Sequence, residues 1–158
     1  MIDVVFDADV NHAGFPATAD IERAARVVCD EAGFSGQPEL CVRFATDEDI
    51  RALNKQWRGR DKVTDVLSFP MQEGPGYDLN MSLGDVALAA RFVRQQASSL
   101  NLPVQAHTLH LIIHAVLHLL GFDHVKDEDA KIMHKLEQHI MQHLSLHNPY
   151  PNHSTAGQ

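Results

Sequence analysis

The sequence has little cysteine and no long apolar run, and each absence narrows the class of protein. Cys29 and Cys41 are the only cysteines among 158 residues, which favours a reduced cytosolic core over a disulfide framework. The longest apolar stretch, residues 109–120, is interrupted by histidines and is too short to span a bilayer. The first residues lack a basic segment followed by an apolar one, so no signal peptide is predicted. We therefore expect a cytoplasmic protein with no membrane partner.

The chain also lacks an excess of positive charge. Its formal net charge is −8, which argues against generic binding to polyanions. Residues 51–105, however, hold seven Lys and Arg against five Asp and Glu, and they form the only net-positive third of the chain. Lys55, Arg58, Arg60 and Lys62 gather there around Trp57. We expect Trp57 to anchor a helix, and the cations to be either a solvated helix end or local phosphate contacts.

The order of patterns predicts a single α+β domain over residues 1–147, with a small sheet packed by helices. β-branched and alternating apolar residues predict the strands, and helical periodicity with caps predicts the helices. The predicted strands are 2–6, 39–45, 63–69 and 83–88, and the predicted helices are 16–32, the stretch between Thr46 and Gly59, 89–100, one starting at Pro103, and 127–146. Ile132, Leu136, Ile140 and Leu144 are predicted to face inward from the last helix. Residues 148–158 have few apolar residues and predict a disordered tail.

One stretch, His114 to His124, concentrates metal-binding side chains. His114 and His118 are four residues apart, so on a helix they lie on one face, roughly 6 Å apart along the axis. Gly121 allows the chain to leave the helix, and the following turn returns His124 towards the same point. Histidines within so apolar a helix need polar partners. A shared ion satisfies all three rings and leaves a coordination position open, as in catalytic zinc sites.

The same spacing matches the zinc-protease pattern His-Glu-x-x-His-x-x-Gly-x-x-His, with one decisive difference. Ala115 stands where that pattern has the glutamate that acts as general base. The ligand set is therefore kept, while the peptide-cleaving machinery is not. The motif favours other metal-assisted chemistry.

At these residues the chain resembles the YbeY family of metal-dependent endoribonucleases. The family motif reads His-Gly-x-Leu-His-Leu-Leu-Gly-Tyr-Asp-His, and the stretch from His114 to His124 departs from it only at Ala115 and Phe122. Neither departure changes a ligand. Further agreement lies outside this stretch and covers most of residues 1–145. It is carried by Thr64 to Pro70, Leu83 to Val86, His107, His110, Met133 and Glu137.

The resemblance implies a four-stranded sheet and a function in RNA processing. It implies single-strand-specific cleavage in maturation of the 16S ribosomal RNA 3′ end and in ribosome quality control. The implied partners are ribosomal RNA, the small ribosomal subunit and its assembly factors. Arg58 matches the catalytic arginine that follows an aromatic residue in this family.

Other residues are weaker candidates for the site. Asp85 either caps a turn at the end of the sheet or lies near the metal as a hydrogen-bond acceptor or proton carrier. Ser68 is not placed in a Gly-x-Ser-x-Gly elbow, so it is structural or lines the cleft. His107 and His110 are expected to pair in the core or line the cleft, with a substrate contact as the alternative. Asp123 is expected to fix the turn before His124.

The leading hypothesis is a zinc-dependent endoribonuclease in which His114, His118 and His124 bind one Zn²⁺ per chain and Arg58 contacts the phosphate. Imidazole ligands also suit nickel, copper and iron, so the residues alone do not fix the metal. Two alternatives remain: a metallopeptidase-like hydrolase, and a metal-stabilised RNA- or ribosome-binding protein without turnover. The general base and the attacking group, either water or the 2′-hydroxyl, are open.

Overall fold

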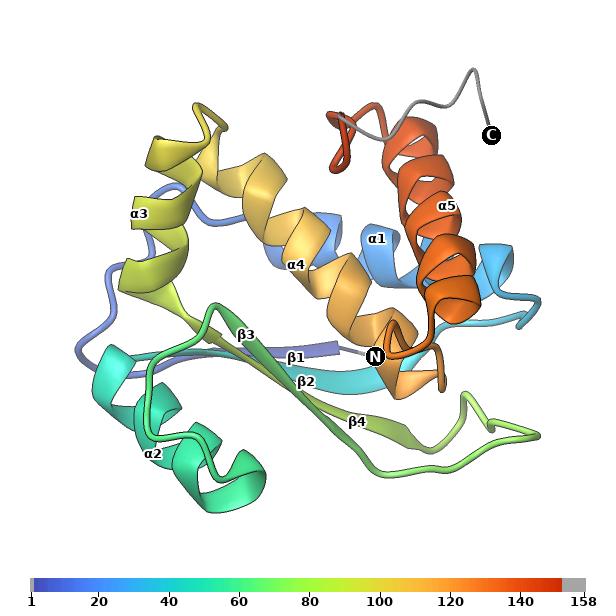
Figure 1. The fold of residues 1–158 in the computed structure, drawn as a ribbon, viewed down its shortest axis with the longest axis horizontal. Coiled ribbons are helices and arrows are strands. Elements are labelled where there is room, and N and C mark those ends of the chain that lie inside the picture. Colours follow the sequence, from blue (N-terminus) through green and yellow to red (C-terminus); the bar gives the residue numbers. More distant parts are fainter. Residues whose placement is uncertain (1, 152–158) are drawn as a thin grey trace.

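Four strands rich in Val, Leu and Phe pair into one mixed sheet, shown in Figure 1. This computed structural model describes residues 2–151. The strands are β1 (Ile2–Phe6), β2 (Glu39–Ala45), β3 (Val66–Pro70) and β4 (Ser82–Ala89), and their order in the sheet is β1-β2-β4-β3. β1, β2 and β4 run parallel, whereas β3 is antiparallel to β4 and forms one edge. The expected small four-stranded sheet is confirmed.

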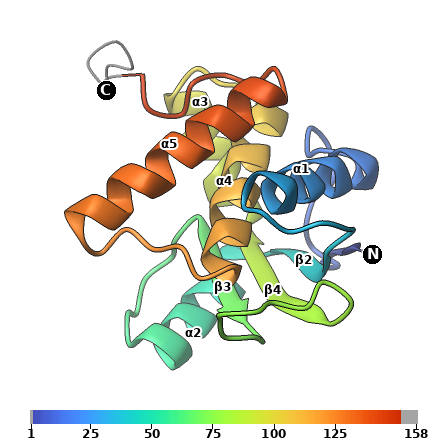
Figure 2. The ribbon, with the colours of Figure 1, turned by 90° about the vertical axis from the view of Figure 1, so that its right-hand side faces the viewer.

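Helices cover the two faces of the sheet unequally (Figures 1 and 2). Among the described residues, one face carries a layer of four helices, and the other carries α2 alone. The helices are α1 (Thr18–Glu31), α2 (Asp47–Arg58), α3 (Ala90–Ser99), α4 (Val104–Leu119) and α5 (Asp127–His143). α4 contacts β3, β4 and all three of its companion helices. Because it is surrounded on most sides, α4 buries most of its apolar residues and His107, whereas His110, His114 and His118 remain partly exposed.

The caps of α2 follow from local side-chain chemistry, as the sequence predicts. The Thr46 hydroxyl accepts a hydrogen bond from the backbone amide of Asp49 at 3.2 Å, which satisfies an amide that the first helical turn leaves free. Gly59 ends α2 in the left-handed conformation, with φ +70°. Ile50 of α2 and Leu67 of β3 belong to a small apolar cluster between this helix and the sheet, separate from the main core under α4.

The inward face of α5 agrees with the prediction at Leu136, Ile140 and Leu144 but not at Ile132. Ile132 is 57% exposed, and the buried positions are Met133, Glu137, Ile140 and Met141. The prediction was wrong for Ile132 because it counted only apolar residues, whereas a glutamate occupies the middle of the true face. Glu137 is accepted there because polar groups on α4 and beyond α5 bond both of its oxygens.

The segment after α5 is described as far as residue 151. Asn148 to Tyr150 fold back on α5, where the Asn148 side-chain oxygen accepts hydrogen bonds from Gln138 Nε2 at 3.2 Å and from the Tyr150 amide at 3.0 Å. The disordered tail expected for residues 148–158 stays a prediction. Residues 152–158 of the predicted tail lie outside the described residues. Within residues 2–151, no helix has the length and apolar character needed to cross a bilayer.

Candidate metal centre

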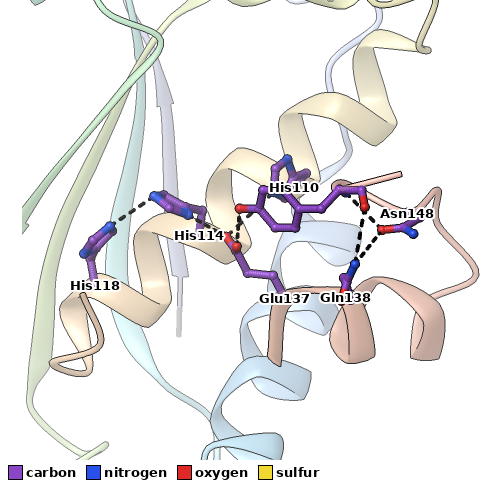
Figure 3. A network of polar contacts seen from close by, with 7 residues as sticks. His110, His114, His118, Glu137, Gln138 and Asn148 are labelled. Atoms are coloured by element: carbon purple, nitrogen blue, oxygen red, sulfur yellow. Dashed lines mark hydrogen bonds and ion pairs between the residues drawn. The ribbon is translucent and has the colours of Figure 1, made fainter. Parts of the chain in front are cut away.

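Three histidines from α4 and the turn after it converge at one point. The ring atoms that can ligate an ion, one from each of His114, His118 and His124, all lie within 4.8 Å of one another. His114 Nε2 and His118 Nε2 are 3.0 Å apart (Figure 3). The ring centroid of His124 lies 5.5 Å from the ring centroid of His114 and 5.1 Å from that of His118. This cluster can hold a metal ion.

The return of His124 depends on how α4 ends. The Gly121 amide bonds the His118 carbonyl at 3.0 Å, and the Phe122 amide bonds the Leu117 carbonyl at 3.1 Å. This pair of bonds is the Schellman arrangement, which requires a left-handed residue, and Gly121 supplies it with φ +94°. Asp123 then accepts a backbone amide of the same turn at 3.2 Å, the turn-fixing role expected from the sequence.

A buried carboxylate orients the first histidine. Glu137 is fully buried, and its Oε1 lies 2.5 Å from His114 Nδ1 (Figure 3). Its Oε2 accepts a hydrogen bond from the Tyr150 hydroxyl. Burial alone raises the pKa of this carboxyl, but the His110 and His114 rings and the Tyr150 hydroxyl outweigh burial and hold it at about 2. An ionised carboxylate on Nδ1 leaves Nε2 of His114 free to ligate, as at known zinc sites.

The electrostatics of His118 suit a metal ligand. Burial lowers the pKa of its imidazole, and the neighbouring His114 and His124 rings lower it further, to about 4. At neutral pH the ring is therefore uncharged and has a lone pair available, which is the form that binds metals. Three convergent imidazoles, one of them oriented by a carboxylate, fit the ion that the sequence motif implies.

The histidine cluster forms one wall of a cavity of about 330 Å³, here called the metal cavity. Arg58, Ser68 and His110, three of the residues singled out from the sequence, line it together with all three histidines. Ala115 lines it as well, at the position where the protease motif has glutamate. The opposite wall comes from β3 and the loop before it, including Asp65. An exposed arginine thus faces a three-histidine cluster across one cleft.

Comparison with known proteins identifies the family. The family profile described as "Endoribonuclease YbeY" matches residues 7–145. The chain belongs to the YbeY endoribonuclease family. It is 39% identical over 135 residues to "Endoribonuclease YbeY" of Chromohalobacter salexigens, covering 85% of this chain and 87% of that protein. A solution structure of a Thermotoga maritima protein shares the fold with a TM-score of 0.53 at 24% identity, covering 100% of this chain and 99% of the other.

One residue singled out from the sequence lies outside the YbeY metal cavity. Asp85 is exposed and lines a separate groove of about 700 Å³ beneath α2, here called the sheet groove. The reason is strand alternation. A Cβ built on Gly84 would approach the Leu119 side chain of α4 to 3.0 Å, so the next residue points to the opposite face of the sheet. The idea that Asp85 supports the metal is therefore corrected.

The two histidines upstream of the ligands behave differently from each other. His107 is buried, and its Nε2 pairs with Gln96 Oε1 at 2.5 Å, so it is a core residue as favoured from the sequence. His110 Nε2 lies 3.7 Å from Glu137 Oε1 and makes no hydrogen bond within the described residues. His110 therefore faces the carboxylate network and the cavity together.

Sequence reasoning missed two members of this YbeY site as functional residues. Glu137 was noted only for its match to the family, although a glutamate four residues after the buried Met133 is a usable signal of an inward polar group. Tyr150 carried no signal at all, because it follows the last helix in a segment without periodicity. The position of its hydroxyl depends on a fold-back that only the three-dimensional structure reveals.

Proposed function

We propose that this chain is a zinc-dependent endoribonuclease that cleaves phosphodiester bonds in single-stranded RNA. The observation that supports it is the shared cavity of three convergent histidines and an arginine in a member of the YbeY family. His114, His118 and His124 hold one Zn²⁺ per chain. The bound ion supplies Lewis acidity, polarising a phosphoryl oxygen and acidifying water.

The residues of the cavity divide the remaining tasks. Arg58 grips two oxygens of the substrate phosphate with its planar guanidinium and neutralises charge that develops there. Glu137 holds His114 in the ligating orientation, at a 2.5 Å contact. Ser68 and His110 line the path of the substrate and are available as hydrogen-bonding contacts. Because the chain carries a net charge of −8, RNA is held by these local contacts rather than by a general positive field.

The biological role that we infer rests on family membership and the motif resemblance. The substrate is the 16S ribosomal RNA precursor, cut in maturation of its 3′ end, and the same activity serves ribosome quality control. The partners are ribosomal RNA, the small subunit and its assembly factors, in the cytoplasm. Neutral ligands leave the full charge of the ion available to an anionic substrate of this kind.

The deciding experiment measures metal content and RNA cleavage on the same purified preparations. Wild-type protein is expected to bind about one zinc per chain and to cleave single-stranded RNA, and a chelator should remove both properties. His124→Ala should lose stoichiometric metal and activity, while His139→Ala, on the exposed side of α5, serves as the control. Full retention of metal by His124→Ala would refute the three-histidine site.

The same assay separates the two alternative functions. Peptide hydrolysis that is abolished by His118→Ala, without any RNA cleavage, would establish a metallopeptidase-like hydrolase. Metal-dependent RNA or ribosome binding without turnover would establish a metal-stabilised binding protein. Ala115 lines the cavity in place of a general base, and this observation favours the nuclease over the peptidase.

A further inference from the structure

The end of α2 presents an exposed aromatic side chain. Trp57 is 64% exposed, so the expectation that it anchors the helix was wrong. Its ring lies edge-on to that of Phe69, at 6.4 Å between centroids and 69° between planes. An exposed indole face is costly in water and suits stacking against a planar partner.

The residues next to Trp57 in the chain carry several exposed positive charges. Lys55, Arg58, Arg60 and Lys62 are exposed, and none forms an ion pair with another described residue. The nearby Arg51, by contrast, is paired with Asp61 at 2.7 Å. Exposed cations near an exposed aromatic side chain are the combination by which proteins hold single-stranded nucleic acid.

This surface is continuous with the metal cavity. Trp57 and Phe69 line the sheet groove, while Arg58 and Ser68 line both the sheet groove and the metal cavity. The two spaces therefore meet over the edge strand β3, and a chain leaving the cavity at that edge reaches Trp57.

We propose that single-stranded RNA flanking the cleaved phosphate crosses β3 and stacks one base on Trp57, with neighbouring phosphates on Arg60 and Lys62. This inference rests on the proposed function and adds a binding track to it. Stacking tolerates any base, so the track selects unpaired RNA without reading its sequence.

Trp57 is the only tryptophan of the chain, so its fluorescence reports directly on this contact. Adding a short single-stranded RNA to chelator-treated wild-type protein should quench the fluorescence in step with binding measured by anisotropy of dye-labelled RNA. Trp57→Ala should weaken binding roughly tenfold and raise KM with kcat nearly unchanged, and Trp57→Phe should recover part of the affinity. Ile132→Ala, an exposed apolar residue on α5, is the control.

Arg60→Gln tests the phosphate contact separately, because it should reduce the salt dependence of binding by about one counterion. If RNA binds without quenching the Trp57 fluorescence, and Trp57→Ala binds RNA with unchanged affinity, the track is overturned while the proposed nuclease function stands. Equal quenching by duplex RNA would overturn the selection of unpaired strands. If the wild-type protein neither binds nor cleaves RNA, both the track and the proposed function are overturned.

A second, independent observation concerns Tyr150. Its hydroxyl donates to Glu137 Oε2, the oxygen opposite the one that holds His114. Its ring packs 4.1 Å from the His134 ring, and its backbone is tied to α5 through Asn148. Burial raises the pKa of the Tyr150 hydroxyl, and the adjacent Glu137 carboxylate raises it further. The hydroxyl therefore keeps its proton and remains a donor. Residue 150 lies beyond the matched family region of 7–145.

We infer that Tyr150 is a positioning residue of the metal centre. With Tyr150 on one oxygen and His114 on the other, the Glu137 carboxylate has one fixed orientation. That orientation sets the ring of His114 and keeps its Nε2 aimed at the cluster. Tyr150 also lines the metal cavity, and this relay through Glu137 is the route by which it positions the ligand His114.

The test compares metal dissociation constants, measured by competition with a chromophoric chelator and without RNA. Tyr150→Phe removes only the hydroxyl and should weaken zinc binding about tenfold, as loss of a supporting hydrogen bond typically does. His134→Ala removes the ring contact but keeps the hydroxyl and should bind zinc normally. Unchanged affinity in Tyr150→Phe, or equal weakening in both variants, would overturn the inference. Zinc binding by wild-type protein without RNA cleavage would instead count only against the proposed function.

Discussion

At the scale of single residues, Arg58 combines exposure with a position at the meeting point of two cavities. No described acid pairs with it, so its charge is available to a phosphate. Removing a charge positioned for the transition state typically costs on the order of a hundredfold in rate, whereas removing a solvated arginine changes stability by less than about 0.5 kcal/mol. Arg58→Ala should therefore keep its zinc and its Tm but lose most RNA cleavage.

Arg58→Lys should recover only part of the activity, because an ammonium group cannot hold two phosphate oxygens at once. Arg23→Ala, an exposed arginine on α1, is the matched control. Cleavage of RNA by Arg58→Ala at the wild-type rate would reduce Arg58 to an ordinary helix-end charge. Steady-state kinetics on one RNA substrate distinguish these outcomes.

Residues whose partners are close in sequence were predictable, and residues with distant partners were not. The grouping of His114, His118 and His124 follows from helix geometry and one glycine, so the sequence was enough to predict it. The contact of Tyr150 with Glu137 links a loop to a neighbouring helix and leaves no periodic signal. The exposure of Trp57 was missed because a tryptophan in an apolar stripe usually indicates core.

At the scale of elements, β4 depends on a glycine where it passes closest to β3. Gly84 has φ +141°, and a Cβ there would lie 2.2 Å from the Phe69 carbonyl oxygen. Because that neighbour is backbone in a paired strand, it cannot move aside without breaking the sheet. Gly84→Ala should lower the free energy of unfolding by more than about 2 kcal/mol, measured by urea denaturation.

Gly33→Ala is the matched control for backbone strain. Gly33 also has a positive φ, of +91°, but a Cβ there would meet nothing within 4 Å. Gly33→Ala should lower the free energy of unfolding only by the conformational strain, about 1 kcal/mol. If both variants lose the same free energy of unfolding, the close approach of β3 to Gly84 adds nothing to the cost of the Gly84 substitution.

Element boundaries were largely predictable, because caps and strand patterns are local. Glu39–Ala45 and the ends of α2 agree with the prediction. On α5, Leu136, Ile140 and Leu144 were predicted to face inward and do so. Ile132 was wrong and Glu137 was missed, because the burial of a charged residue depends on partners outside the helix. The strand order β1-β2-β4-β3 was not predicted, since it reflects packing between elements rather than any one segment.

At the scale of the whole molecule, histidines whose pKa is lowered by partial or full burial make stability depend on pH. In the metal-free protein, burial and the other two cluster rings lower the pKa of His118 from 6.5 to about 4. Burial also lowers the pKa of His107 and of His147. Between pH 6.5 and about pH 4, the unfolded chain binds a proton at His118 that the folded chain does not bind. Unfolding is therefore favoured as the pH falls.

The stability of chelator-treated protein should therefore be complete above about pH 6.5 and decline as the pH falls towards 4. Each such histidine contributes a slope of at most about 1.4 kcal/mol per pH unit. His118→Gln cannot take up the proton and should flatten the curve in this window, whereas His143→Gln, at an exposed site on α5, should leave its slope unchanged. Urea unfolding at a series of pH values measures the slopes. An unchanged slope in His118→Gln would show that His118 accepts its proton as readily in the folded protein as in the unfolded chain. The cluster would then hold no neutral, metal-ready imidazole at that position below pH 6.5.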